Sequence, residues 1–562
     1  MIAAIEVDLR RSRLGFPFDP LASFRGRPLL AATIEAALRC PEVDRVLVLA
    51  SSADAKTIEA ALKAGGVLEG AGPGPRPRKA GRGGPRFQVV PCDGEDIPSR
   101  DTIRRLRRLS PSSWRAGWAI PFALAEGGNP RWLLKAFGMV RDERMVLLPP
   151  AAPFLAPDLL GKVISEAHNH KGSMVRIATT PPGLAGDVIH RSLVPELDRL
   201  HAPVDMPLWF IPDRPERSLE NKDVYHWFQE GISGFGTRLT AESARGLRIL
   251  EKVAGLLDPS APVDAGACLE RLAARPDVVA GPVPAELRVE VTGRTRLASS
   301  IDPRPDQAPG PAPGSLDMDP GLFARISREA GAWQECRLVI GGGEPLLHPR
   351  APEILQAARR SGAGMVVLET DGLDLSPEVV DLLASTVDMV SISIDAATRE
   401  TYRALQGVDR LEEVERGVER LLERRAASGG WPEVAVGLRI VDENRGEVEA
   451  FFDRWFRKTR FVVVRGPSDR AGQIPARSIH PARTPHRIPC LHLMESLQVL
   501  PGGTAVVCGN DFRATVPAGD LNTSTIEEIW GAQPLATLRE AHGRGDWDRF
   551  PLCSRCGDWC RR

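Results

Sequence analysis

Short apolar runs alternate with amphipathic stretches along most of the 562-residue chain. Near the start, the runs 1–9 (MIAAIEVDL) and 44–52 (DRVLVLASS) are typical of buried strands, and apolar residues at helical spacing predict a helix within 27–43. A strand interrupted by prolines at 144–157 precedes a predicted helix at 157–169. This alternation predicts a three-layer α/β domain with a mainly parallel sheet.

The second half of the chain repeats this rhythm. Strands are predicted at 287–291 (LRVEV), 336–341 (CRLVIG), 364–370 (GMVVLET), 388–395 (DMVSISID), 433–441 (EVAVGLRIV) and 460–466 (RFVVVRG). Helices are predicted at 319–331, 352–361, 376–385, 411–426 and 446–457. Such a run of βα units predicts a partial or full (β/α) barrel, in which functional residues lie at the carboxyl ends of the strands.

These patterns predict three domains: an α/β domain at 1–277, a (β/α) partial barrel at 284–480 and a small cysteine-rich domain at 485–562. Residues 64–86, rich in glycine, proline and arginine, predict a flexible insertion. Lysine plus arginine and aspartate plus glutamate both number 73, so no net field favours nucleic acid or a membrane surface as a partner. The first residues lack the features of a signal peptide and no apolar stretch reaches membrane-spanning length, which predicts a cytoplasmic protein.

Five of the nine cysteines lie after residue 489, at Cys490, Cys508, Cys553, Cys556 and Cys560. The residues between the first two predict a strand–turn–strand hairpin that turns at 501–503. A hairpin that brings two thiols near a C-x-x-C pair can present four thiolates to one soft metal centre. Such a donor set suits either a [4Fe–4S] cluster or Zn²⁺, and the spacing leaves both open.

A second motif lies in the predicted barrel, at 337–349 (RLVIGGGEPLLHP). An apolar strand ends in three glycines and a glutamate. This pattern predicts a loop whose backbone and single carboxylate can contact a ligand. Glycines occur where the backbone must approach another group closely.

With these motifs, residues 284–562 resemble the radical S-adenosylmethionine (SAM) superfamily with a C-terminal SPASM or twitch domain. The resemblance rests on 341–349 (GGGEPLLHP), 390–407 (VSISIDAATRETYRALQG), 490–512 and 550–560 (FPLCSRCGDWC). It implies that the SAM amino group meets Gly342, Gly343 and Glu344, and that the ribose lies near Ser393 and Asp395. It also implies an auxiliary [4Fe–4S] cluster held by Cys490, Cys508, Cys553 and Cys556, with Cys560 as a substitute ligand or a bystander.

The same resemblance points to a missing site. The family holds its reactive cluster with a C-x-x-x-C-x-x-C motif after the first barrel strand, and here those positions are Thr295, Ser299 and Asp302. Hydroxyls are poor ligands for iron–sulfur clusters, and one carboxylate cannot replace three thiolates. We therefore expect the reactive cluster to be absent and SAM, if it binds, to bind weakly.

The N-terminal segment 10–51 resembles the start of sugar-activating nucleotidyltransferases, including cytidylyltransferases and spore-coat-polysaccharide relatives. In that family a Ser-Arg-Leu-Pro-Gly-Lys loop grips the nucleotide phosphates. This chain keeps Ser12, Arg13 and Leu14 but lacks the lysine, and the family's metal-binding aspartate aligns with Ala151. An apolar methyl cannot hold Mg²⁺, so nucleotide transfer is not expected.

Two functions from different classes follow. In the first, the chain is a pseudoenzyme that keeps the tail cluster and binds an active radical SAM paralogue, a polysaccharide-pathway enzyme or a sugar-nucleotide ligand, in glycan, surface-polysaccharide or peptide-modification metabolism. In the second, it is an active radical SAM enzyme or sugar-activating nucleotidyltransferase with an unconventional site. The cysteine-free stretch 292–302 (TGRTRLASSID) favours the first, and the intact GGEP-type loop keeps the second open.

Overall fold

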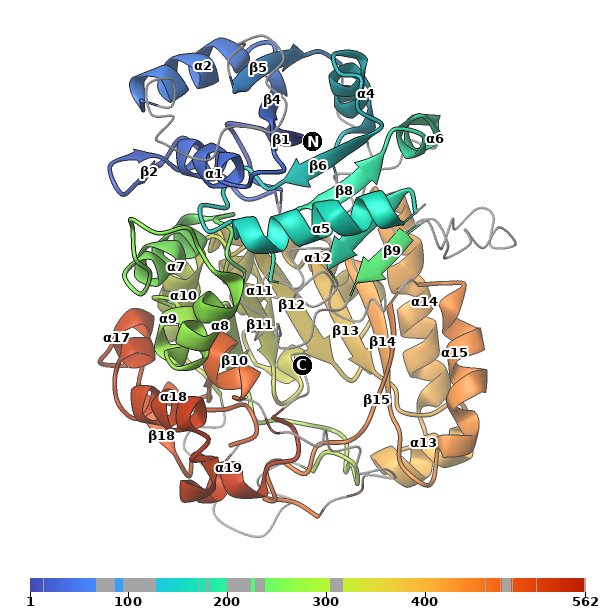
Figure 1. Cartoon of the computed structure of the whole chain (residues 1–562). Helices are drawn as coiled ribbons and strands as arrows, with labels where there is room; N and C mark the ends of the chain where they lie inside the picture. Colours follow the sequence, from blue (N-terminus) through green and yellow to red (C-terminus); the bar gives the residue numbers. More distant parts are fainter. Residues whose placement is uncertain are drawn as a thin grey trace. The chain divides into compact units, whose positions relative to one another are not determined.

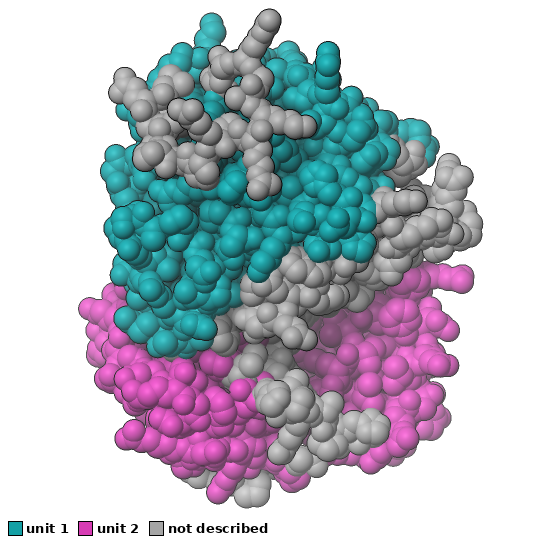
Figure 2. Space-filling view, in the orientation of Figure 1, with its two compact units in different colours: residues 1–281 teal, residues 282–562 magenta. Residues whose placement is uncertain are grey.

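The computed structural model divides into two compact units, residues 1–281 and 282–562 (Figure 2). The residues described are 1–13, 15–66, 86–94, 128–170, 172–177, 181–199, 224–227, 238–303, 317–459, 461–475, 477, 487, 489–511 and 513–559. The predicted insertion at 64–86 therefore lies mostly outside the described residues, as do Leu14 and Cys560. Among the helices of the described residues, none is both long and apolar enough to cross a membrane.

Unit 1 contains a seven-stranded sheet with the order β5-β4-β1-β6-β8-β7-β9. The strands are β1 (Ile2–Val7), β4 (Arg45–Ser51), β5 (Phe87–Cys92), β6 (Arg144–Leu148), β7 (Met174–Ile177), β8 (Asp187–His190) and β9 (Val224–Trp227), and a small hairpin joins β2 (Ser23–Phe24) to β3 (Arg27–Pro28). Strands β5, β4, β1 and β6 run parallel, β8 runs antiparallel to β6 and β7, and β9 is parallel to β7. The mainly parallel sheet predicted from the sequence is confirmed.

Helices cover both faces of this sheet, because alternate strand residues are apolar on both sides. Ala3 and Ile5 of β1 belong to one buried core, and Ile2 and Ala4 belong to a second core. The first core includes α1 (Leu29–Leu38), α2 (Ala55–Ala64), α5 (Pro157–Asn169), α7 (Ala244–Ala254), α8 (Ala265–Ala273) and α9 (Pro276–Ala280). The second core includes α4 (Pro130–Gly138) and α6 (Leu193–Arg199). Unit 1 is thus a three-layer α/β structure.

Unit 2 is built on a nine-stranded sheet with the order β15-β14-β13-β12-β11-β10-β16-β17-β18. Figure 1 labels strands β10 to β15 of this sheet. The strands are β10 (Glu286–Glu290), β11 (Arg337–Gly341), β12 (Met365–Thr370), β13 (Met389–Ser393), β14 (Glu433–Arg439), β15 (Phe461–Arg465), β16 (Ser496–Val499), β17 (Thr504–Val506) and β18 (Pro517–Asp520). Neighbours from β15 to β16 are parallel, and β16, β17 and β18 pair antiparallel. All six predicted barrel strands form in chain order, and the described strands make an open, partial barrel.

The helices of unit 2 follow their strands in βα order. They are α10 (Pro320–Gly331), α11 (Ala351–Arg360), α12 (Pro377–Thr386), α13 (Arg399–Gln406), α14 (Leu411–Ala427) and α15 (Val448–Phe456), with short 3-10 turns η2 (Pro345–Leu347) and η3 (Arg445–Glu447). Five of these helices lie within two residues of their predicted bounds. The sequence prediction missed α13, which begins after the N-cap residue Thr398 and ends before Gly407, whose backbone is left-handed.

The tail of unit 2 continues the same sheet. The predicted hairpin at 501–503 is confirmed by antiparallel pairing of β16 and β17, but residues 491–495, expected to begin its first strand, form the helix α16 (Leu491–Glu495). The tail also contains α17 (Ile526–Gly531), α18 (Leu535–Arg544), η4 (Trp547–Arg549) and α19 (Pro551–Arg555). Because β16 pairs parallel with β10, the first strand of the tail completes the sheet that begins the unit.

Two glycines that end helices in unit 2 allow a matched test of this packing. A Cβ atom on Gly331 would lie 1.8 Å from the Ser361 carbonyl oxygen, whereas one on Gly531 would meet none of the described atoms within 4 Å. We predict that Gly331→Ala lowers the free energy of unfolding by about 1–3 kcal/mol, because the backbone must shift. Gly531→Ala should change it by less than about 0.5 kcal/mol. Urea unfolding followed by circular dichroism compares them, and equal effects would contradict the close packing of α10 on the end of α11.

Candidate functional site

Register along the strands divides the sheet of unit 2 into an apolar face and a polar face. Leu287, Leu338 and Leu368 belong to the apolar face and are fully buried. Side chains alternate across a strand, and parallel neighbours in register share a face. The opposite face therefore carries a polar set near the carboxyl ends of the strands: Arg288, Glu290, Glu369, Ser393, Arg439 and Arg465. We call this the polar face.

Asp395, expected beside a ribose, is fully buried just after β13 and pairs with Arg439. Arg439 Nη2 lies 2.5 Å from Asp395 Oδ2, the Arg439 backbone N–H donates to Oδ1 at 2.8 Å, and Gln406 Nε2 donates to Oδ2 at 3.0 Å. Asp395 has a φ of 65°, a left-handed conformation that is uncommon outside glycine. Its carboxylate is thus engaged by the protein itself, while Ser393 lies half-buried two residues earlier on the polar face.

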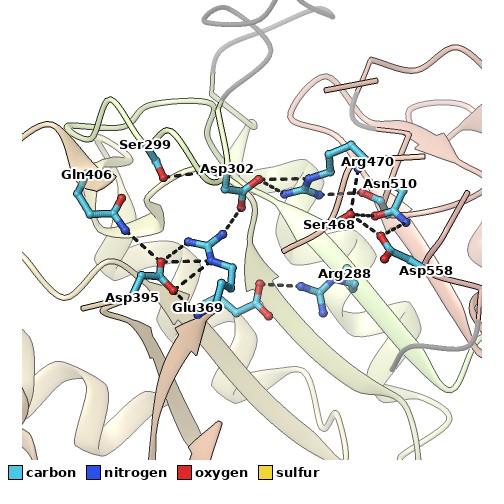
Figure 3. Close-up of polar contacts among 12 residues, drawn as sticks. Arg288, Ser299, Asp302, Glu369, Asp395, Gln406, Ser468, Arg470, Asn510 and Asp558 are labelled. Atoms are coloured by element: carbon cyan, nitrogen blue, oxygen red, sulfur yellow. Dashed lines mark hydrogen bonds and ion pairs between the residues drawn. The ribbon is translucent and has the colours of Figure 1, made fainter. Parts of the chain in front are cut away.

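Asp302, at the third expected cluster-ligand position, lies between two arginines (Figure 3). Its Oδ2 accepts from Arg439 Nη1 at 2.9 Å, and its Oδ1 accepts from Arg470 Nη2 at 2.7 Å. Burial alone would lower the pKa of Arg439, but Asp395 and Asp302 together raise it above its ordinary value. Arg439 therefore stays charged and joins the loop after β10 to the end of β13.

The other two expected ligand positions are used in local turns. The Thr295 hydroxyl accepts from the Leu297 backbone N–H at 3.0 Å, and the Ser299 hydroxyl accepts from the Asp302 N–H at 3.3 Å. The same loop is held to the end of α13, because Ala298 N–H donates to the Gln406 carbonyl at 3.1 Å. These hydrogen bonds give the loop a fold that needs no metal.

The GGEP-type loop follows β11, as expected, but its glycines pack against the protein. A Cβ on Gly342 would come within 2.5 Å of the Glu290 side chain, and one on Gly343 would lie 2.2 Å from the Thr292 carbonyl oxygen. The φ of Gly342 is +97°, which other residues rarely adopt. These contacts account for the two glycines without a ligand, so glycine content alone does not indicate one here.

Glu344 is buried and directs its carboxyl group into the structure. It accepts from the Asp371 backbone N–H at 2.7 Å, from the Thr370 hydroxyl at 2.9 Å and from the Leu346 N–H at 3.1 Å. Burial raises the pKa of Glu344 well above its ordinary value, and the neighbouring Asp371 carboxylate raises it further. A ligand ammonium group would have to compete with these donors.

The tail brings together the four described cysteines that the resemblance assigns to a cluster. Cys490 precedes α16, Cys508 follows β17, Cys553 lies in α19 and Cys556 ends it. Burial raises the pKa of Cys490 to about 12 and that of Cys553 to about 11, and it also raises the pKa of Cys508 and Cys556. Cys490, Cys553 and Cys556 each raise the pKa of Cys508 further, so the four thiols lie within electrostatic reach of one another.

Hydrogen-bond donors point at these sulfur atoms. Asn510 N–H donates to Cys508 Sγ at 3.4 Å, Asp558 N–H donates to Cys556 Sγ at 3.3 Å, and the Asn510 amide reaches Cys556 Sγ at 3.9 Å. The Arg487 guanidinium donates to the Cys553 carbonyl at 2.9 Å and favours the thiolate forms of Cys553 and Cys556 by lowering their pKa values against the effect of burial. Such donors stabilise thiolates that ligate iron, so the donor set fits an iron–sulfur cluster.

The described residues contain no group of three or more His, Cys, Asp or Glu that would hold a single metal ion. A four-iron cluster is bound by a separate thiolate at each iron, so its ligands need not converge on one point. Cys560, the fifth cysteine of the tail, lies outside the described residues. The isolated Cys336 is buried immediately before β11, at the opposite end of that strand from Glu344.

A short segment after β15 connects the polar face to the tail. Arg470, which pairs with Asp302, also donates to the Gly509 carbonyl at 3.2 Å, next to Cys508. Ser468 donates to Asp558 at 2.5 Å, and Gln473 donates to the Asn510 carbonyl at 2.8 Å. The turn that carries Cys508 is therefore fixed by the same segment that fixes Asp302 (Figure 3).

In unit 1, the residues that resemble a nucleotide-binding loop are also held by the protein. The Arg13 N–H donates to Glu242 Oε2 at 3.1 Å, and the Arg13 guanidinium donates to the Leu148 carbonyl at 2.9 Å. Ser12 is buried, and Ala151 is buried in the larger core of the unit. The methyl group of Ala151 thus has a packing role at the end of β6.

The ion pair between Asp302 and Arg470 can be tested by a double-mutant cycle. The two side chains are 33% and 22% exposed, so we predict a coupling energy of about 1–2 kcal/mol from Asp302→Ala, Arg470→Ala and the double variant. The Glu419–Lys458 pair, whose side chains are 50% and 41% exposed, is the control and should give less than about 1 kcal/mol. Chemical denaturation measures both cycles. A coupling energy no larger than that of the control pair would contradict a role for Asp302 in holding these segments together.

Comparison with known proteins gives two family matches, both in unit 2. Residues 310–452 match the radical SAM superfamily, and residues 490–557 match SPASM, an iron-sulfur cluster-binding domain. The chain is 37% identical over 116 residues to a GTP 3',8-cyclase of Chlorobaculum tepidum, which covers 20% of this chain and 33% of that protein. It is 31% identical over 209 residues to the mycofactocin maturase MftC of Mycobacterium ulcerans, covering 36% and 53%. The chain thus spans about a third to a half of the length of these two curated relatives.

Solved structures with similar regions include SuiB of Streptococcus suis bound to S-adenosylmethionine. It has 14% identity and a TM-score of 0.36, covering 49% of this chain and 74% of that one. A cytidylyltransferase from Leptospira borgpetersenii has 14% identity and a TM-score of 0.33, covering 50% and 96%. Unit 2 therefore contains one region, residues 310–452, that matches the radical SAM superfamily and a later one, residues 490–557, that matches the SPASM iron-sulfur cluster-binding domain.

Proposed function

We propose that the chain is a radical SAM/SPASM protein that has lost reductive cleavage of SAM and keeps an iron–sulfur cluster in its tail. It acts as a binding or scaffold component beside an active relative, in glycan, surface-polysaccharide or peptide-modification metabolism. One observation supports the loss above the others: Asp302, at an expected cluster-ligand position, is bound by Arg439 and Arg470. A carboxylate held between two guanidinium groups is not offered to iron.

The donor set after β10 does not fit a reactive cluster. Such a cluster takes three thiolates from the protein, and Thr295, Ser299 and Asp302 supply two hydroxyls and a carboxylate. Cys336, at the far end of β11, is not placed to compensate. The argument depends only on the types of side chain at these three positions, and it applies with or without a ligand on the polar face.

Weak SAM binding is consistent with this proposal. The loss of the cluster removes the two chelating bonds of the SAM amine and carboxylate, and Glu344 is already engaged by three donors. An amine–carboxylate contact contributes on the order of 1 kcal/mol at a partly exposed site, which cannot give tight binding alone.

The names of the relatives favour no single pathway. They are called a GTP 3',8-cyclase and a mycofactocin maturase, and unit 1 resembles sugar-activating nucleotidyltransferases at 10–51. Arg13 and Ala151 do not offer the phosphate and metal contacts of the nucleotidyltransferases, because both are engaged within unit 1. Unit 1 is therefore proposed to bind a partner or a sugar-nucleotide ligand without catalysing nucleotide transfer.

The second candidate function is an active radical SAM enzyme with an unconventional site. The retained GGEP-type loop favours it, because Glu344 still lies just beyond the carboxyl end of β11. Iron content separates the two functions: about four irons per chain correspond to the tail cluster alone, and about eight correspond to two clusters.

We predict that anaerobically reconstituted protein contains about four irons per chain and forms no 5′-deoxyadenosine from SAM and dithionite. Multiple turnovers by the wild-type chain would overturn the proposal. The variant Thr295→Cys/Ser299→Cys/Asp302→Cys should raise the iron content to about eight if only the ligands were lost. Iron that stays at about four would mean that the arginines around position 302 exclude a cluster as well.

A second test concerns the tail. Cys553→Ser and Cys556→Ser should each remove the iron and the thiolate-to-iron absorption band and lower the melting temperature, because a small cysteine-rich region depends on its metal. Cys336→Ala, a buried cysteine outside the tail, is the control and should retain the iron. A colourless protein that binds stoichiometric zinc would contradict the iron–sulfur assignment.

A further inference from the structure

The polar face carries two arginines side by side at the ends of its last two strands. Arg439 of β14 and Arg465 of β15 are direct partners in the parallel register, so their side chains leave the same face. Like charges on neighbouring strands repel each other unless a counter-charge lies between them.

The two arginines are compensated very differently. Arg439 is paired with Asp395 and Asp302 and is only 13% exposed. Arg465 is exposed, and in the described part of the chain its guanidinium has no hydrogen bond or ion pair with another residue. The other arginines of the region are occupied: Arg288 binds Glu369 at 2.6 Å, and Arg470 binds Asp302.

The surroundings of Arg465 disfavour its positive charge when no anion is bound. Loss of hydration lowers the pKa of Arg465, and repulsion from Arg439 lowers it further, although Glu369 and Asp395 act in the opposite direction. Arg465 thus combines an exposed side chain with a position beside a second positive charge.

We propose that Arg465 binds the carboxylate or phosphate group of an anionic ligand at the carboxyl ends of β14 and β15. The planar guanidinium fork matches both groups through two parallel hydrogen bonds, and an anion would also offset the repulsion from Arg439. The carboxyl ends of the strands are where ligands reach a sheet of βα units. This inference deepens the proposed binding role, and it does not depend on whether SAM is cleaved.

The test uses the full-length protein with two simple probes, inorganic pyrophosphate and succinate, without SAM. Isothermal titration calorimetry should show that Arg465→Gln weakens binding of at least one probe tenfold or more. Arg465→Lys, which keeps the charge but loses the fork, should give an intermediate loss. The matched control is Arg457→Gln at the end of α15, because Arg457 is also exposed and without a polar partner in the described residues.

A second readout does not depend on the stability of the variants. In the wild-type protein, phenylglyoxal should modify Arg465 faster than the paired Arg439 and Arg470, and the probe that binds should slow this modification, as measured by peptide mass spectrometry. The probe that protects identifies the ligand group as phosphate or carboxylate. Equal binding by wild type and Arg465→Gln, an equal loss in Arg457→Gln, or no protection by either probe would overturn the proposal. None of these results would alter the 5′-deoxyadenosine measurement, so the two proposals fail separately.

Discussion

Asp302, Arg439 and Asp395 form an alternating row of charges on which the arrangement of the strand ends in unit 2 depends. The central arginine is largely buried, and an unpaired charge there would be strongly destabilising. Each carboxylate comes from a different segment, one after β10 and one after β13, so both ion pairs of Arg439 form only when both segments are in place. The uncommon backbone conformation of Asp395 is held by the same contacts.

A row of this kind specifies geometry more than it adds stability. Removing charges from water offsets much of their mutual attraction, and an apolar replacement is often as stable. The row fixes where these segments lie relative to one another. Arg470, which pairs with Asp302, also donates to the Gly509 carbonyl, next to the tail residue Cys508. Through Asp302 and Arg470, the loop after β10 thus connects the partial barrel to the tail.

Local patterns in the sequence predicted most of the fold, because apolar runs and helical spacing are properties of neighbouring residues. The helix α13 was missed because it is short and largely polar, although Thr398 and Gly407 mark its ends. The partners of Asp302 lie 137 and 168 residues away, and no local pattern shows which arginine reaches which carboxylate. The glycines after β11 predict close approach of the backbone to another group, but the sequence does not show which: Gly342 packs against the Glu290 side chain and Gly343 against the Thr292 carbonyl oxygen. The grouping of the tail cysteines could be predicted from the sequence, since a C-x-x-C and a hairpin bring together thiols that are close in the sequence.

The pairing of β16 with β10 has a consequence for the synthesis of the chain. Strand β10 leaves the ribosome about 200 residues before the strand that covers its free edge, and domains fold as units during translation. Until β16 arrives, one side of β10 presents unpaired backbone groups, which are a template for pairing with another chain. Nascent or prematurely terminated forms would therefore expose a strand edge that can pair with other chains and aggregate. Binding of a chaperone during this interval would favour correct folding. The tail thus acts as the closing strand of the unit as well as the carrier of its cysteines.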